Sequence, residues 1–203
     1  MRSNFGLSEA QMNSPDDQDG LKHLNFDSLS NVMLRCRLEV KLIVYQFGNP
    51  VDAVYSLYRR GYARAHFNKL EPPFSEKQCS PGVTTNVSLY ANKQQDLLGL
   101  RKHFESYLTA SLVRPLIFLK SSTRRRPYVL ASLREIMVYF GLKPKVDQRQ
   151  VNNETKETNI TFVSKYKDEP GFDTLTSTYK SFNVMLEKFG TISLASRGII
   201  YTW

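Results

Sequence analysis

The sequence predicts an α/β fold in which a parallel sheet is flanked by helices. Two segments, residues 38–47 and 114–120, contain the apolar runs that are typical of buried strands. Each is followed by a segment with helical periodicity, and apolar strands that alternate with helices indicate a parallel sheet. We expect the polar residues 1–20 to form a flexible arm and residues 21–203 to form a single domain.

An Asn-Pro turn separates the first strand from a helix. Asn49-Pro50 ends the strand, because proline disfavours the helical conformation of the residue before it. The spacing of apolar residues predicts a helix over residues 51–67. Its apolar face would contain Val54, Leu57, Tyr58, Gly61 and Tyr62, and its polar face Arg59, Arg60 and Arg64.

The rest of the chain continues this alternation with longer connections. Residues 70–93 contain Pro-Pro and Pro-Gly pairs and predict a long loop. Residues 143–171 are polar and irregular, and residues 196–203 are expected to be a coil tail. Apolar positions spaced by three and four predict further helices over residues 95–108, 127–140 and 173–189.

The chain is strongly basic, with a formal net charge of +9 and a pI near 9.5. This charge favours an anionic partner, such as a nucleotide, a nucleic acid, a sulfated or phosphorylated substrate, or a membrane surface. A basic surface without a dedicated partner is the alternative, and composition leaves both open. Arg124, Arg125 and Arg126 form a short run that suits either a phosphate backbone or a solvated turn.

Cysteine and histidine content indicates neither a disulfide framework nor a metal centre. Cys36 and Cys79 do not form a CxxC pair, and the three histidines have no metal-ligand spacing. No apolar run approaches the roughly 18 residues that cross a bilayer, and the first residues are polar. We therefore expect a cytoplasmic protein. On this basis, the glycosylation sequons at Asn86, Asn153 and Asn159 are chance matches.

The predicted topology also indicates where a ligand would bind. In open α/β sheets, ligands lie beyond the carboxyl ends of the parallel strands. Residues 47–56 and 120–126 follow the two predicted strands, and both segments are close to arginines or lysines. The sequence thus favours an anion site at this edge.

The run "LIVYQFGNPVDAVYSLYRRGY" combines a strand, an Asn-Pro-x-Asp turn and a helix with a serine. It resembles the P-loop sulfotransferases, in which a strand, an Arg-Asn-Pro-x-Asp turn and a helix with a serine follow one another. The later run "DLLGLRKHFESYLT…RPLIFLKSS…VLASLREIMVYFGL" has the family's order of helix, strand and helix. Together they cover roughly residues 40–142. "SRGIIYTW", at the end of the chain, echoes the family's Arg-Lys-Gly…Trp motif through Arg197 and Gly198.

The resemblance implies a site for 3′-phosphoadenosine 5′-phosphosulfate, the sulfuryl donor. Ser56 would donate its hydroxyl to the donor's 3′-phosphate, and the start of the helix would add backbone N–H groups and its dipole. Asn49 matches the turn, and Asp52 would cap the helix or brace the turn. Arg59 and Arg60 would contribute only if the helix presents them to the strand ends, since a solvated face is their expected place.

The sequence also departs from the family pattern. Gly48 stands where the family has an arginine, and Ser121-Ser122 replaces a Tyr-Glu pair after Lys120. Residues 1–40 contain no strand followed by the Gly-rich turn that would hold the 5′-phosphosulfate. "SPGVTT", residues 80–85, lies in the predicted loop and is a weak substitute. The fold would then be truncated at its N-terminus, or its donor site degenerate.

Three functions are compatible with these residues. The first is sulfuryl transfer from the donor nucleotide to a hydroxyl or amine of a small-molecule or glycan acceptor. The second is a non-catalytic relative that binds a nucleotide or a protein partner, and the third is nucleic-acid binding by the basic segments. Transfer would need a general base. His66 and His103 are candidates by residue type alone, and both are expected at the surface.

Overall fold

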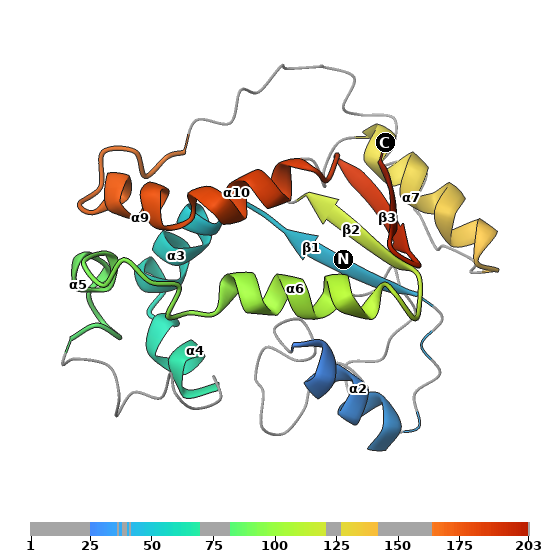
Figure 1. Ribbon diagram of the computed structural model, residues 1–203, viewed down its shortest axis with the longest axis horizontal. Helices are drawn as coiled ribbons and strands as arrows, with labels where there is room; N and C mark the ends of the chain where they lie inside the picture. The colour runs from blue at the N-terminus through green and yellow to red at the C-terminus, as the bar shows by residue number, and fades with distance from the viewer. Residues whose placement is uncertain are drawn as a thin grey trace. The chain divides into compact units, whose positions relative to one another are not determined.

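Four strands form one mixed sheet, so the chain has an α/β fold. β1 (Ile43–Phe47) pairs in parallel with β2 (Leu116–Lys120), and β3 (Ile192–Ser196) and β4 (Ile199–Thr202) continue the sheet as antiparallel strands. The strand order is β1-β2-β3-β4 (Figure 1). The predicted α/β class is confirmed, but the sheet contains one parallel pair and is not purely parallel.

The computed structural model describes residues 25–35, 37, 40, 42–69, 82–120, 127–141 and 164–202. These residues fall into two compact units. The first contains the four strands, α2, α7 and α6 from His103 onward, and the second contains the other helices. The predicted arm (1–20), the arginine run (124–126) and most of the irregular segment (143–171) lie outside the described residues. The helices are α2 (Phe26–Arg35), α3 (Pro50–Arg59), α4 (Ala63–Lys69), α5 (Val87–Ala91), α6 (Leu100–Ala110), α7 (Pro127–Tyr139), α9 (Phe172–Thr178) and α10 (Lys180–Glu187).

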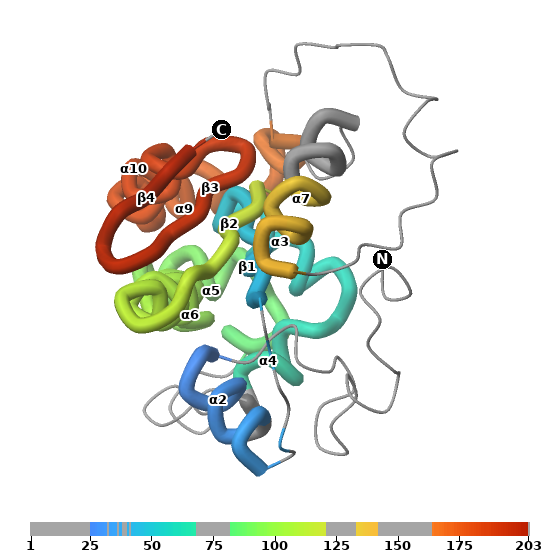
Figure 2. Tube along the Cα trace, turned by 90° about the vertical axis from the view of Figure 1, so that its right-hand side faces the viewer, coloured from blue at the N-terminus to red at the C-terminus, as the bar shows by residue number. Residues whose placement is uncertain are grey.

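The core of the first unit lies on both faces of β2. On one face, the ring of Phe118 packs against Phe104 of α6 and against Phe189, with centroids 5.3 and 5.0 Å apart. On the other face, Ile117 packs with Leu133 of α7. Figure 2 shows α6 and α7 on opposite sides of β2. Since successive strand side chains point to opposite faces, burial on both explains the continuous apolar run of this strand.

A C-terminal hairpin replaces the coil tail predicted for residues 196–203. Arg197 and Gly198 form its two-residue turn, with φ angles of 50° and 80°. Two consecutive positive φ angles are typical of a type I′ turn, whose twist matches that of antiparallel strands. The Arg197 N–H donates to the Ser111 carbonyl at 2.9 Å, which attaches the turn to the segment before β2. The apolar residues of β4 are adjacent to each other, so the sequence lacks the alternation of a half-buried strand.

The helix predicted for residues 51–67 is two helices, α3 and α4, because the chain turns at Gly61. Gly61 has a φ of +72°, a conformation that a side chain disfavours. The Tyr62 N–H donates to the Leu57 carbonyl at 2.9 Å, and the Gly61 N–H donates to the Tyr58 carbonyl at 3.0 Å. This pair of hydrogen bonds closes a helix in the Schellman pattern. Apolar periodicity continues across Gly61 and therefore does not reveal the break.

The buried face of α3 also differs from the prediction. Val54 and Tyr55 are buried, whereas Tyr62, expected on the apolar face, is 53% exposed. The Tyr55 ring stacks on Tyr166 with centroids 5.0 Å apart, and its hydroxyl donates to the Pro170 carbonyl at 2.8 Å. These contacts attach α3 to the segment that precedes α9 in the second unit.

Asp96 determines where α6 begins. Its Oδ1 accepts from the Leu100 N–H at 3.0 Å, and its Oδ2 accepts from the Arg101 N–H at 2.8 Å. Both amides belong to the first turn of the helix, where N–H groups have no partner within the helix. The helix therefore starts at Leu100, later than the predicted residue 95.

A buried chain of hydroxyl groups lies at the junction of α9 and α10. Tyr179 lies between them, and its hydroxyl donates to Asp96 Oδ1 at 2.7 Å. Because the Tyr179 proton is used in this bond, Tyr90 must donate in the 2.6 Å bond between the two hydroxyls, and Tyr90 accepts from the Leu98 N–H at 3.4 Å. The helix predicted for residues 173–189 is interrupted where this contact is made.

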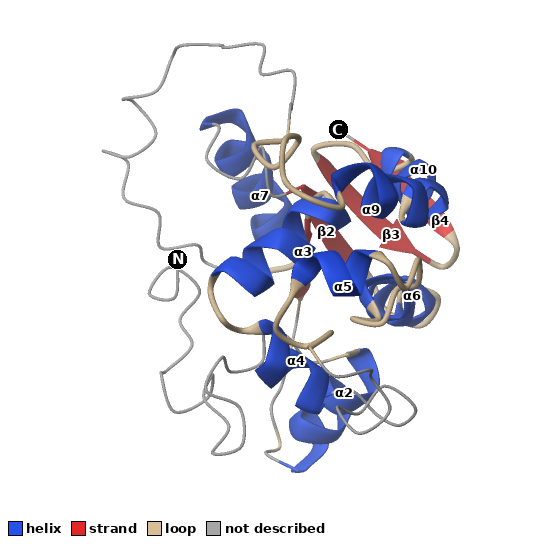
Figure 3. Cartoon of the chain, turned by 90° about the vertical axis from the view of Figure 1, so that its left-hand side faces the viewer, coloured by secondary structure: helices blue, strands red, loops and turns tan. Residues whose placement is uncertain are grey.

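Contacts among helices hold the second unit together. α3 contacts α4, α5 and α9, while α9 also contacts α5 and α10. Figure 3 shows α3, α5 and α9 as neighbours. α5 lies within the loop predicted for residues 70–93, and Asn86 caps it by accepting from the N–H groups of Ser88 and Leu89. In the part of the chain that the structure describes, no helix has both the length and the apolar character needed to span a bilayer.

α7 follows its prediction closely. It spans Pro127–Tyr139, against the predicted 127–140, and Gly141 follows with a φ of +69°. α2 spans Phe26–Arg35, before the first predicted strand.

Replacing Gly61 tests the helix break. Space for a Cβ is available there, with no heavy atom within 4 Å, so strain in Gly61→Ala comes from the backbone alone. We expect Gly61→Ala to lower the free energy of unfolding by about 1 kcal/mol, as measured by urea denaturation. Gly61→Asn is the matched control, because asparagine tolerates this conformation better and should lose less stability. Equal losses in the two variants would contradict the backbone explanation.

Tyr55 should contribute a pH-dependent part of the stability. Burial, followed by the nearby carboxylates of Glu169 and Asp173, raises its pKa from 10.0 to about 12. Its stabilising contribution is therefore complete below pH 10 and is lost as the pH rises toward about 12. We expect Tyr55→Phe to lose less unfolding free energy than the wild type over this interval, with Tyr62→Phe as a control on the surface. An equal loss in wild type and Tyr55→Phe would show that Tyr55 is not the group that titrates.

Candidate functional site

Asn49 caps the start of α3. This residue is the N-cap, and its Oδ1 accepts from the N–H groups of Val51 and Asp52 at 2.8 and 3.3 Å. The Ala53 N–H donates to the Asn49 carbonyl at 3.0 Å, and Pro50 has no N–H. The resemblance implied that backbone N–H groups here would contact a phosphate. Because these groups are bound to Asn49, the first turn offers an anion its dipole but no N–H group from residues 50–53.

Ser56 and Arg59 of α3 lie on one side of the helix with Arg60, its C-cap residue. Residues three and four positions apart lie on the same side of a helix, which places both arginines one turn beyond Ser56. Ser56 is half-buried, and within the described residues no hydrogen bond of its hydroxyl is seen. Arg59 and Arg60 are exposed, as expected for a solvated face. The arrangement combines a hydroxyl donor with two guanidinium groups, which suits a phosphate.

Asp52 lies one turn before Ser56 and has a bracing role. The Ser164 hydroxyl donates to Asp52 Oδ1, and the same Ser164 oxygen accepts from the Tyr166 N–H at 3.1 Å. The carboxylate thereby holds the segment that enters α9.

The two ends of β2 carry different candidate residues. Lys120 is the last residue of β2 and lies opposite Phe47, at the carboxyl ends of the parallel pair. Arg197 and Gly198 follow β3, which runs antiparallel to β2 and pairs Ala195 with Leu116. They therefore lie at the end where β1 and β2 begin, and the five residues of β2 span about 13 Å. The echo of the family's closing motif is not brought to the edge where the parallel strands end.

The turn at residues 82–85 is packed into the second unit. Val83 and Thr84 are buried, and the Val83 carbonyl accepts from the Tyr58 hydroxyl. The Thr85 hydroxyl donates to the Gly82 carbonyl at 3.2 Å. The expectation that "SPGVTT" is a poor substitute for the phosphate loop stays a prediction, since residues 70–81 lie outside the described part.

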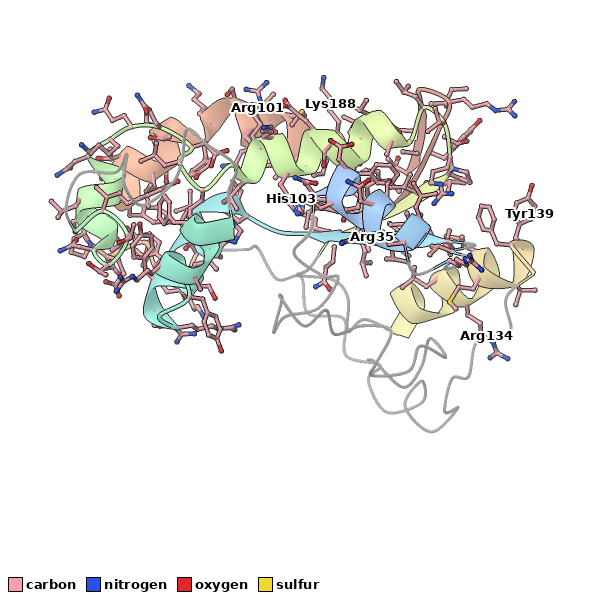
Figure 4. The ribbon with its side chains drawn as sticks, turned by 90° about the horizontal axis from the view of Figure 1, so that it is seen from below. Arg35, Arg101, His103, Arg134, Tyr139 and Lys188 are labelled. Atoms are coloured by element: carbon pink, nitrogen blue, oxygen red, sulfur yellow. The ribbon has the colours of Figure 1, made fainter. Side chains whose placement is uncertain are left out.

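Both candidate histidines are half-buried, so the expectation of surface histidines is wrong. His66 Nε2 contacts the Leu98 carbonyl at 3.2 Å. His103 Nδ1 forms a 2.9 Å hydrogen bond with the Tyr45 hydroxyl, and Figure 4 shows its ring between α6 and β1. Desolvation raises the pKa of Tyr45, so this hydroxyl stays protonated at neutral pH. The bonds fix both rings as parts of the packing and assign neither a role in catalysis.

Comparisons with known proteins add no relative to these observations. No family model, characterised protein or solved structure matches the chain. Among the described residues, no three His, Cys, Asp or Glu side chains come together as metal ligands.

Proposed function

We propose that the chain is a sulfotransferase-like protein that binds the 3′-phosphate of an adenosine nucleotide on α3. One observation carries the proposal: the half-buried Ser56 shares a helix side with the exposed Arg59 and Arg60. The serine hydroxyl supplies a directional donor at the position that the family resemblance assigns to phosphate binding. The arginines compensate in charge for the arginine that Gly48 replaces.

The charges near Ser56 in the sequence are mostly positive. Arg59 and Arg60 bring two positive charges against the single negative charge of Asp52, whose carboxylate accepts from the Ser164 hydroxyl. Asn49 is the N-cap of α3 and not a phosphate ligand, because its Oδ1 already accepts hydrogen bonds from two backbone amides. The nucleotide site on α3 therefore consists of Ser56, Arg59 and Arg60. Arg197 and Gly198 are not included, since they form the turn between β3 and β4 in the first unit, whereas α3 belongs to the second.

Sulfuryl transfer is the activity that the resemblance adds to this site. The donor would be 3′-phosphoadenosine 5′-phosphosulfate, and the acceptor a hydroxyl or amine of a small molecule or glycan. Such transfers depend mainly on positioning and on stabilisation of charge around the moving group. Asn49, Ser56 and the two arginines have no part in moving the acceptor proton. A relative that binds nucleotide without transfer is therefore the alternative that the same site supports.

Calorimetric titration with adenosine 3′,5′-bisphosphate tests the proposal. We expect saturable one-to-one binding that weakens about tenfold in Ser56→Ala, because a hydrogen bond to a charged group contributes about 1.5 kcal/mol. The double variant Arg59→Gln/Arg60→Gln should bind more weakly and show a smaller loss of affinity as salt is raised. Ser177→Ala, an exposed serine of α9, is the matched control and should bind as the wild type does.

The possible results separate the candidate functions. Absence of binding by the folded chain, or equal weakening in Ser56→Ala and Ser177→Ala, would reject the α3 site. Binding followed by release of adenosine 3′,5′-bisphosphate from the sulfated donor, with a panel of hydroxyl and amine acceptors, would establish transfer. Binding without release would identify a nucleotide-binding relative.

A further inference from the structure

A small cavity lies at the end of the sheet where β1 and β2 begin. Its volume is about 200 Å³, and it is lined by Val40, Leu42, Ile43, Arg114 and Pro115. All of these residues belong to the first unit. The cavity is thus at the opposite end of the parallel pair from Lys120, and none of its residues belongs to α3.

Arg114 supplies the charged group of this cavity. Its Nη1 is buried and has no hydrogen-bond partner among the described residues. Its backbone is held in place, since the Arg114 N–H donates to the Ala110 carbonyl at 3.1 Å where α6 ends. A guanidinium group carries five N–H donors and no acceptor, and it stays charged at any physiological pH. Burying such a donor without an acceptor is costly, which points to a group that is bound there.

The other residues of the lining define what kind of group fits. Val40, Leu42, Ile43 and Pro115 bring no acidic side chain and no side-chain acceptor. Among the described residues of the lining, none therefore neutralises the positive charge of Arg114. Ordinary ligand pockets measure roughly 300–1,000 Å³, so this cavity is smaller than a nucleotide site. Its size and charge suit a small anion.

We propose that this cavity binds a small oxyanion, a carboxylate or a tetrahedral oxyanion, through the guanidinium group of Arg114. The planar fork of arginine pairs with two oxygens of such a group at once, and an amine cannot reproduce this geometry. Arg197 adds positive charge at the same end of the sheet, because its turn is bonded to Ser111. The site is separate from the nucleotide site on α3, and neither proposal depends on the other.

The test follows the side-chain Nε–H signal of Arg114 by NMR while the full chain is titrated with sodium acetate or sodium sulfate. Sodium chloride at equal ionic strength is the reference. We expect a saturable shift of this signal with at least one of the two probes, and a rise in thermal midpoint over the chloride reference. The probe that binds more tightly distinguishes a carboxylate site from a site for tetrahedral anions.

Two lysine variants make the test specific. Arg114→Lys keeps the charge but removes the planar guanidinium group, and it should lower the affinity for the anion about tenfold. Arg134→Lys makes the same change on α7, where the side chain is exposed (Figure 4), and it should leave anion binding unchanged. Arg197→Asn suits a type I′ turn and tests whether nearby charge alone explains the effect.

Three results would overturn the proposal. The first is a shift of the Arg114 signal that matches the chloride reference for both probes. The second is equal anion binding in wild type and Arg114→Lys. The third is a larger loss in Arg197→Asn than in Arg114→Lys. If Arg114→Lys does not fold, the wild-type titration against chloride still decides, because a shift without saturation rejects the site.

Discussion

The pairing of β2 with strands on both sides organises the first unit. Its residues Leu116–Leu119 are almost fully buried, and their side chains supply both the aromatic face and the aliphatic face of the core. Burial at about 25 cal/mol per Å² of apolar surface makes such a strand the main source of stability of its sheet. β2 also sets directions: its parallel neighbour β1 ends at the same edge, and its antiparallel neighbour β3 ends at the other. Lys120 and the Arg197-Gly198 turn, which the resemblance would assign to one site, are therefore at opposite edges of the sheet.

Local patterns predicted β2 and α7. β2 is a continuous apolar run and α7 has apolar residues spaced by three and four, so the sequence shows both directly. The breaks at Gly61 and Tyr179 were not predictable in this way. Apolar periodicity shows only which side of a helix is buried. The break at Gly61 depends on the positive φ angle of this residue, and the contact of Tyr179 is with Asp96, 83 positions away in the sequence. The C-terminal hairpin was missed because its edge strand has adjacent apolar residues, two of which, Ile199 and Tyr201, are exposed, so the sequence lacks the apolar-polar alternation of a half-buried strand.

The candidate sites differ in how far the sequence reveals them. Ser56 and the two arginines of α3 share a spacing that can be read without a structure, and their common side follows from it. The bonds of Asn49 to the amides of the first turn could not be read in this way, since an asparagine before a helix suits a cap and a ligand equally. No sequence pattern pointed to Arg114 as a binding residue. The proposal depends on its buried Nη1, which has no acceptor among the described residues, and the sequence does not show which donors are buried.

The hydroxyl chain of the second unit has a fixed polarity. A single carboxylate, that of Asp96, orients Tyr179, and Tyr179 in turn orients Tyr90. Burial raises the pKa of both tyrosines, so both phenol groups stay protonated at neutral pH. The negative charge of Asp96 keeps the two phenol dipoles aligned. Through them it connects α5, the start of α6 and the junction of α9 with α10.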